Sequence, residues 1–151
     1  VSLAATFVAV YSAYVDRTYA RASVWPRLEI FRSFSGSSFE YGVSNRGTGP
    51  AVIKYAKVSF ESNIIKQWSD LEEFKGITQS HVGSRVLPSE QSIKPVIKRG
   101  EDVRDIFTLD QFVSIELCYC SVYGECWVQD RQNLPKPTQE CLIDEKDRFL
   151  E

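Results

Sequence analysis

Four cysteines are the residues of this sequence whose type and spacing best suit chemistry. Cys118, Cys120, Cys126 and Cys141 all lie in its last quarter, and an even number of clustered cysteines is typical of disulfides. An alternating stretch that ends at Cys120 and another that begins at Cys126 predict a β-hairpin in which these two residues are opposed. Opposed Cβ atoms lie about 4.5–5.5 Å apart, close enough to bridge. We therefore expect the pairs Cys120–Cys126 and Cys118–Cys141, with the other connectivities left open.

The same thiols are compatible with two other states. One is a set of reduced cysteines in a cytosolic protein, and the other is a zinc site. Zinc sites usually pair cysteines two to four residues apart, whereas one, five and fourteen residues separate these. We therefore expect no metal and no cofactor. Disulfides form in oxidising compartments, so they predict a domain on the extracytoplasmic side of a membrane, the periplasmic side in a bacterium.

The other residues show no pattern typical of acid–base or nucleophilic catalysis. His81 is the only histidine, and the sequence has no Gly-x-Ser-x-Gly motif that would present a nucleophilic serine. Adjacent carboxylates such as Glu72 and Glu73 would suit hydrolysis of a sugar polymer, but acidic residues at a helix start are explained by the helix dipole. We therefore predict no catalytic residue and a surface position for His81.

Three residues of the predicted hairpin are candidates for a partner contact or for the core. Glu116 shares a face with Cys118 and Cys120, and that face is either solvated or a groove covered by the carboxy-terminal segment. Tyr123, at the hairpin tip, suits an exposed anchor for a partner, and Trp127 suits the core. Glu116 and Tyr123 are therefore the predicted partner contacts.

The size and composition describe one folded domain. The chain has 151 residues, of which 43% are hydrophobic and 25% charged, and these values exclude a disordered or wholly membrane-embedded protein. Its 18 Lys and Arg against 20 Asp and Glu give a formal net charge of -2. Such a balance provides no long-range field to attract a polyanion, so we predict no nucleic-acid partner.

Short alternating stretches separated by turn residues predict a mainly β fold after residue 25. About seven strands at this spacing favour an immunoglobulin-like antiparallel β-sandwich, with a partly open barrel as the alternative. The predicted strands lie at 26–30, 39–44, 51–61, 86–87, 92–98, 112–121 and 126–130.

Two helical segments and an extended tail complete this prediction. A capping-box pattern at 69–72, with Trp68, Leu71 and Phe74 at helical spacing, predicts a short crossing helix. A helical turn is expected at 101–107. From Pro135 onward we expect an extended, solvated tail.

The stretch containing Asn45, Gly47, Gly49 and Pro50 predicts a structural loop. Its glycines allow positive φ, its asparagine can bond to its own backbone, and its proline fixes φ before the next strand. A phosphate-binding loop is the alternative, but the Lys-Ser/Thr ending of a P-loop is missing and a strand follows in place of a helix.

The first fourteen residues carry no charge, and this predicts a helix that contacts a membrane. Fourteen helical residues cover roughly 21 Å of a hydrocarbon core about 30 Å thick. Because the sequence starts at Val and contains no Met, we expect the end of a truncated transmembrane helix at 1–22, followed by the β domain at 23–151. The small residues Ala5, Ala9 and Ala13 form a face suited to close helix packing.

Two other interpretations of the amino terminus remain open. Leu3, Phe7 and Val10 also repeat as in an amphipathic helix packed on a partner or on its own domain, and residues 20–22 resemble a signal-peptide cleavage site. Arg17 and Arg21 next to the apolar run favour a cytoplasmic flank under the positive-inside rule, in conflict with the location that disulfides predict.

Three stretches together resemble a known group of proteins: residues 23–28 directly after the apolar helix, residues 45–51, and residues 119–127. They look like the markers of bacterial single-span envelope proteins that have a short cytoplasmic start, one membrane helix and a small exported β domain. The resemblance covers nearly the whole chain and implies topology and fold. The group has no assigned activity, so it implies no catalytic residue.

These observations predict a non-enzymatic binding domain of a membrane-anchored envelope protein. We expect it to be a subunit or accessory of a membrane protein assembly, with a protein partner or a second copy of the chain as its contact. An envelope enzyme or ligand sensor acting on cell-wall material, with Glu116 at its site, is the alternative.

Overall fold

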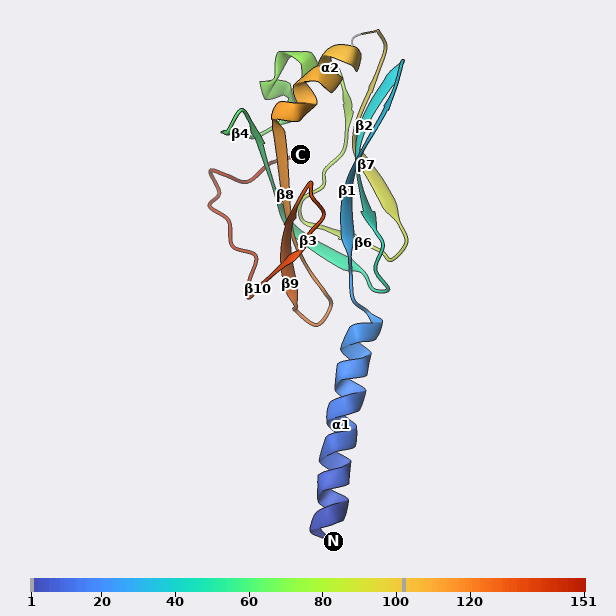
Figure 1. Ribbon diagram of the computed structural model, residues 1–151. Coiled ribbons are helices and arrows are strands. Elements are labelled where there is room, and N and C mark those ends of the chain that lie inside the picture. Colours follow the sequence, from blue (N-terminus) through green and yellow to red (C-terminus); the bar gives the residue numbers. More distant parts are fainter. Residues whose placement is uncertain (1, 102) are drawn as a thin grey trace.

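The computed structural model describes residues 2–101 and 103–151 as a mainly β protein. Ten strands form two antiparallel sheets in these residues, accompanied by the helices α1 (Leu3–Ser23) and α2 (Val103–Leu109). Figure 1 shows α1 as a rod that projects from one end of the sheets, while α2 lies at the opposite end.

The first sheet contains a tight hairpin extended by two further strands. Its order is β1 (Leu28–Ser35), β2 (Ser38–Asn45), β7 (Ser92–Arg99) and β5 (Thr78–Gln79). The two-residue connection between β1 and β2 places Ser35 opposite Ser38 and Leu28 opposite Asn45. The hairpin thereby brings the end of β2 next to the chain that leaves α1.

The second sheet is built around its longest strand, β3. Its order is β10 (Lys136–Thr138), β9 (Cys126–Asp130), β8 (Val113–Cys120), β3 (Ala51–Phe60) and β4 (Asn63–Ile65), with β6 (Arg85–Leu87) also paired to β3. β8 pairs with β3 along one edge, while β4 and β6 pair with opposite ends of β3. β3 therefore connects most of this sheet.

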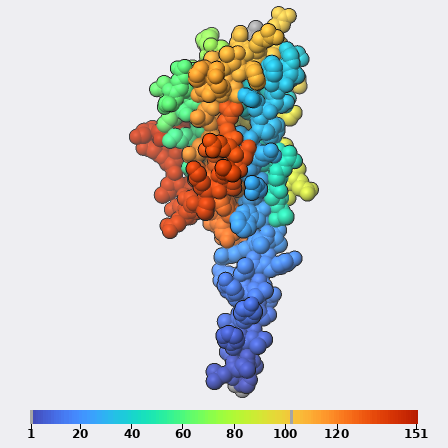
Figure 2. All heavy atoms as spheres, in the orientation of Figure 1, coloured from blue at the N-terminus to red at the C-terminus, as the bar shows by residue number. Residues whose placement is uncertain are grey.

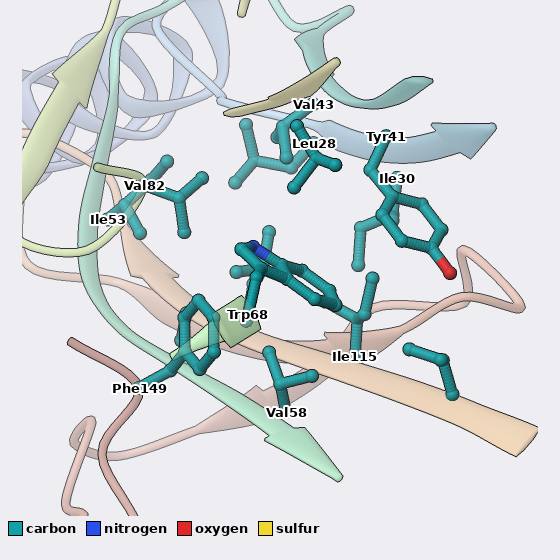
Figure 3. Packing of buried hydrophobic residues seen from close by; sticks show 14 of the residues in the cluster. Leu28, Ile30, Tyr41, Val43, Ile53, Val58, Trp68, Val82, Ile115 and Phe149 are labelled. Atoms are coloured by element: carbon teal, nitrogen blue, oxygen red, sulfur yellow. The ribbon is translucent and has the colours of Figure 1, made fainter. Parts of the chain in front are cut away.

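The two sheets pack around one apolar core. Alternating residues of each sheet point inward (Figure 3), among them Leu28, Ile30, Tyr41 and Val43 from the first sheet and Ile53, Val58 and Ile115 from the second. Trp68, from the connection after β4, lies between the sheets at 4% exposure and stacks on Tyr41 with ring centroids 5.3 Å apart. The arrangement of two facing sheets is that of a β-sandwich.

The predicted strands are all present, but the predicted crossing helix is wrong. Two 3-10 turns, Trp68–Asp70 and Glu72–Phe74, replace it, because Leu71 between them is extended. The capping box begins at Gln67, and not at Ser69: the carboxylate of Asp70 accepts hydrogen bonds from the backbone N–H groups of Lys66 (2.8 Å) and Gln67 (3.2 Å). This irregular path lets both Trp68 and Phe74 reach the core.

Three additional strands, β4, β5 and β10, were not predicted from the sequence. They contain three, two and three residues, too few for an alternation to be recognised. The helical turn expected near residue 101 is present as α2.

The predicted tail after Pro135 is only partly solvated. It first pairs with β9 as β10 and then runs irregularly from residue 139 to 151. Phe149 enters the core at 4% exposure, with its ring centroid 5.2 Å from that of Trp68. The backbone N–H of Phe149 also donates to the carbonyl of Ala56 at 2.9 Å. The segment 139–151 is therefore part of the packed domain.

Helix α1 makes no comparable contact with the sheets. None of its residues is buried, and Figure 2 shows it as an isolated stalk. The alternative interpretation, in which α1 packs on its own domain, is therefore wrong. In the part of the chain that the structure describes, no helix has both the length and the apolarity needed to cross a membrane.

Candidate functional site

The predicted loop after β2 holds the linker between α1 and β1. Asn45 is fully buried, and its Oδ1 accepts hydrogen bonds from the backbone N–H groups of Arg27 (3.2 Å) and Gly47 (2.9 Å). Its Nδ2 donates to the carbonyls of Gly49 (2.8 Å) and Leu87 (3.0 Å). One amide side chain thus ties together the linker, its own loop and β6.

The two glycines of this loop allow its backbone to lie directly against the backbone of the linker. Neither has a positive φ, so the predicted reason for their presence is wrong. A Cβ at Gly47 would lie 2.2 Å from the carbonyl oxygen of Trp25, and one at Gly49 would lie 2.0 Å from that of Val24. Between them, the backbone N–H of Thr48 donates to the Trp25 carbonyl at 2.9 Å. Any side chain at either glycine would displace the linker.

Aromatic and charged contacts bring the β8–β9 loop to the same place. The ring of Trp25 stacks on that of Trp127, with centroids 5.4 Å apart, and Trp127 lies in the core as predicted. The guanidinium of Arg21, in the last turn of α1, lies 3.7 Å from the carboxylate of Glu125. Linker, Asn45 loop and β8–β9 loop therefore meet at the base of α1.

An open groove lies at this junction, and we call it the helix-base groove. Its volume is about 770 Å³, within the range of small-molecule sites. The indole and proline rings of Trp25, Pro26, Trp127, Pro135 and Pro137 form apolar walls. Arg27, Arg46 and Glu125 supply charge. The groove is suited to a ligand with a flat apolar face and polar groups at its edges.

The three stretches that carry the family resemblance converge at this groove. Residues 23–28 form the linker, residues 45–51 the loop beneath it, and residues 119–127 the strand ends and loop beside it. No family model, curated protein or solved structure matches the chain. The three stretches contact one another where α1 joins the sheets.

Both predicted disulfides are present, and each involves a cysteine of β8. Cys120–Cys126 crosses the β8–β9 hairpin between directly paired residues, with Cα atoms 4.0 Å apart. Cys118–Cys141 attaches the segment 139–151 to β8, with Cα atoms 5.7 Å apart. One disulfide thus closes the hairpin beside the helix-base groove, and the other fixes the path of the segment.

Glu116 lies outside the helix-base groove, on a face of the second sheet that the segment 139–151 partly covers. It is half-buried and accepts a hydrogen bond from the Tyr55 hydroxyl at 3.1 Å. Burial, together with the negative charge of Glu116, raises the pKa of Tyr55 to about 12. On the same face, Lys57 pairs with Asp147 of the segment at 3.5 Å. The structure therefore gives Glu116 a stabilising contact within the protein.

The other predicted site residues lie apart from Glu116. Tyr123 is at the tip of the β8–β9 loop and is 51% exposed. Ala5, Ala9 and Ala13 lie along α1 and are exposed. The structure thus places Tyr123 at the α1 end of the domain, and it does not bring Tyr123 and Glu116 together.

A buried ionic network at the opposite end gave no signal in the sequence. Asp110, 1% exposed, accepts hydrogen bonds from the Tyr41 hydroxyl (2.6 Å) and from Nη2 of Arg131 (2.9 Å), and it also pairs with Arg32. Burial, followed by the hydrogen bond to Asp110, raises the pKa of Tyr41 far above its ordinary value. Since two guanidinium groups and a hydroxyl contact this carboxylate, the network is suited to holding β1, β2 and the residue that follows β9 against the 3-10 turn Asp110–Phe112. His81 is exposed, as predicted.

Proposed function

We propose that this protein is a non-enzymatic binding domain held at a membrane by α1, where it serves as a subunit or accessory of a membrane protein assembly. The exposure of α1 carries this proposal. Large apolar side chains project from it on several sides, including Leu3 at 91%, Phe7 at 74% and Val8 at 64% exposure. Continuous apolar surface of this kind on a folded protein is normally covered by lipid or by a partner.

The order of side chains along α1 supports membrane contact. Residues 2–15 carry no charge, and the charged residues Asp16, Arg17 and Arg21 follow on the side of the sheets. Two half-exposed aromatic residues, Trp25 and Tyr123, lie at the same end of the domain. Aromatic rings next to an apolar helix favour the membrane–water interface. In this proposal the apolar part of α1 is inserted and the β domain lies at the membrane surface.

The face formed by Ala5, Ala9 and Ala13 supports a second role for α1. Small residues four positions apart let another helix approach closely inside a membrane. A helix of a protein partner, or α1 of a second copy, would then cover this face while lipid covers the larger side chains. The helix thereby provides the anchor and part of the contact within the assembly.

We also propose that the domain lies on the extracytoplasmic side of the membrane and that its sandwich is immunoglobulin-like. Two disulfides support the oxidising, extracytoplasmic side of the membrane, which is the periplasm in a bacterium. Arg17 and Arg21 on the domain side of the apolar run weigh against it under the positive-inside rule. The resemblance to single-span envelope proteins supports the exported location, and the two facing antiparallel sheets support an immunoglobulin-like sandwich.

Flotation with lipid vesicles tests the proposal. The wild-type chain should rise with phosphatidylcholine vesicles through a density gradient. The double variant Phe7→Asp/Val10→Asp should bind the vesicles at least about tenfold more weakly than the wild type, because a carboxylate in the hydrocarbon costs several kcal/mol.

A matched control changes two exposed apolar residues away from α1, as Val86→Asp/Leu142→Asp. This variant should float like the wild type. Wild-type protein that stays monomeric at the bottom of the gradient would contradict the proposal, and so would equal flotation of the Phe7→Asp/Val10→Asp variant.

A ligand sensor for cell-wall material is a second candidate, favoured by the helix-base groove. Stacked indole rings provide the kind of flat apolar surface on which sugar rings pack. Soluble cell-wall glycan fragments should therefore change the tryptophan fluorescence of the wild type. Trp25→Ala should abolish this response while Val86→Ala retains it, and a wild type that shows no response to these fragments would remove this candidate.

A further inference from the structure

The two disulfides touch each other. Sγ of Cys120 lies 3.7 Å from Sγ of Cys141, although these cysteines belong to different bonds. The sulfur atoms of Cys120, Cys126 and Cys141 all lie within 4.8 Å of one another. A thiolate released at one bond is therefore already next to a sulfur atom of the other.

Three of the four cysteines line one open surface cavity. The cavity measures about 850 Å³ and is lined by Cys120, Cys126 and Cys141, with Lys54 and Glu140 supplying charges of opposite sign. Cys118 does not line it and is completely buried. Cys120 and Cys126 line the cavity at 5% and 7% exposure, so the cavity is the route by which an external thiol would approach their bond, whereas Cys118 is closed to it.

We propose that the four cysteines form a thiol–disulfide exchange site, in which reduction of one bond moves the tether of Cys141 from Cys118 to Cys120. The reductant is an external dithiol, small or carried by another protein. One of its thiolates attacks Sγ of Cys126, the Cys120–Cys126 bond breaks, and Cys120 leaves as a thiolate. The second thiol of the reductant then displaces Cys126, which takes up a proton, and the reductant leaves as a disulfide.

The second stage needs no further electrons. The Cys120 thiolate attacks Sγ of Cys141, the Cys120–Cys141 bond forms, and Cys118 leaves as a thiolate that takes up a proton. In total, two electrons and two protons pass from the dithiol to the protein, whose thiols are then Cys118 and Cys126. The two alternative bonds to Cys141 span 23 and 21 residues, so the entropy of closing the two loops is nearly equal.

This exchange keeps the segment 139–151 attached to β8. Cys141 is bonded before and after a two-electron reduction, and Phe149 can keep its place in the core. The thiol that results from the exchange is Cys118, which is shielded from further reaction by its burial. This inference is independent of the proposed membrane anchoring.

The variant Cys126→Ser tests the exchange without a reductant. It leaves the Cys120 thiol free beside the Cys118–Cys141 bond, so the protein partitions between two isomers of equal oxidation state. After incubation at about pH 8, where thiolate is formed, the thiols are quenched in acid and alkylated. Chymotryptic cleavage after Tyr119 then separates Cys118 from Cys120 for mass spectrometry.

We expect the Cys120–Cys141 peptide, together with alkylated Cys118, at an abundance within about tenfold of the original pair. Untreated wild type should give only its two native pairs and no alkylation, which controls for exchange during digestion. A variant with native circular dichroism in which Cys120 is fully alkylated and Cys141 is bonded only to Cys118 would overturn the proposal.

Limited reduction of the wild type provides a second test that does not depend on the folding of a variant. One equivalent of dithiothreitol under argon should yield a two-electron-reduced protein alkylated at Cys118 and Cys126. Alkylation restricted to Cys120 with Cys126, or to Cys118 with Cys141, would show that each bond opens alone and would overturn the exchange.

Discussion

Asn45 is a single side chain on which three parts of the structure depend. Its replacement by alanine leaves the carbonyls of Gly49 and Leu87 and the N–H of Arg27 without their partners. Because unpaired buried polar groups are costly, Asn45→Ala should lower the free energy of unfolding by about 3 kcal/mol. Urea denaturation followed by circular dichroism measures this change.

The matched control is Asn63→Ala, at an exposed asparagine whose side chain makes one long hydrogen bond of 3.5 Å. Its effect should stay within about 0.5 kcal/mol of the wild type. An equally small effect of Asn45→Ala would show that the loop and the linker are held together by other contacts.

Titration of Tyr55 should lower the free energy of unfolding as the pH rises in alkaline solution. Burial and the charge of Glu116 raise its pKa to about 12 in the folded protein, while the unfolded chain titrates near the ordinary value of about 10. Between these two values the unfolded chain loses a proton that the folded protein retains. The stabilisation is therefore complete below about pH 10 and is lost as the pH rises toward 12.

The variant Tyr55→Phe lacks this contribution. Its free energy of unfolding should fall less than that of the wild type between about pH 9 and pH 11, by on the order of 1 kcal/mol. Tyr11→Phe, on exposed α1, should follow the wild-type profile. Chemical denaturation at the two pH values measures the difference, and identical profiles for Tyr55→Phe and wild type would refute the assignment.

At the scale of elements, the joint between α1 and the sheets depends on Gly49. A Cβ at this position would lie 2.0 Å from the carbonyl oxygen of Val24, and backbone atoms cannot move aside independently. Gly49→Ala should displace the linker, separate Trp25 from Trp127, and lower the free energy of unfolding by about 2 kcal/mol. The near-ultraviolet circular dichroism of the tryptophans reports the separation.

Gly36→Ala is the control for this variant. Gly36 lies in the β1–β2 turn, and a Cβ there would meet nothing within 4 Å. The control should keep the wild-type tryptophan signal. If Gly49→Ala also keeps it, the close approach of loop and linker does not position Trp25.

For the whole molecule, the state of the cysteines decides the proposed location. The protein is recovered from its native compartment, alkylated without reduction, and its intact mass is measured. It should carry no alkyl group, because both disulfides are formed. Reduction before alkylation should then add four groups. Four groups without prior reduction would place the protein in a reducing compartment and overturn the exported location.

The sequence by itself determined the features that depend on neighbouring residues. Apolar alternation and turn residues identified seven of the ten described strands, the three-residue β6 among them, and the uncharged apolar run at the amino terminus identified α1. The Cys120–Cys126 pair followed from the hairpin register, because a short turn fixes which residues are opposed. With that pair assigned, Cys118 and Cys141 were left for each other.

Only the tertiary structure decided what depends on contacts between distant residues. Phe149 enters the core because the Cys118–Cys141 bond and β10 direct its segment back across β3. The helix-base groove exists because Asn45 and its glycines hold the Trp25 linker against the β8–β9 loop. The buried Asp110 and the contact between the two disulfides arise in the same way. Periodicity reports which face of an element is buried, whereas packing in three dimensions determines which residues lie against that face.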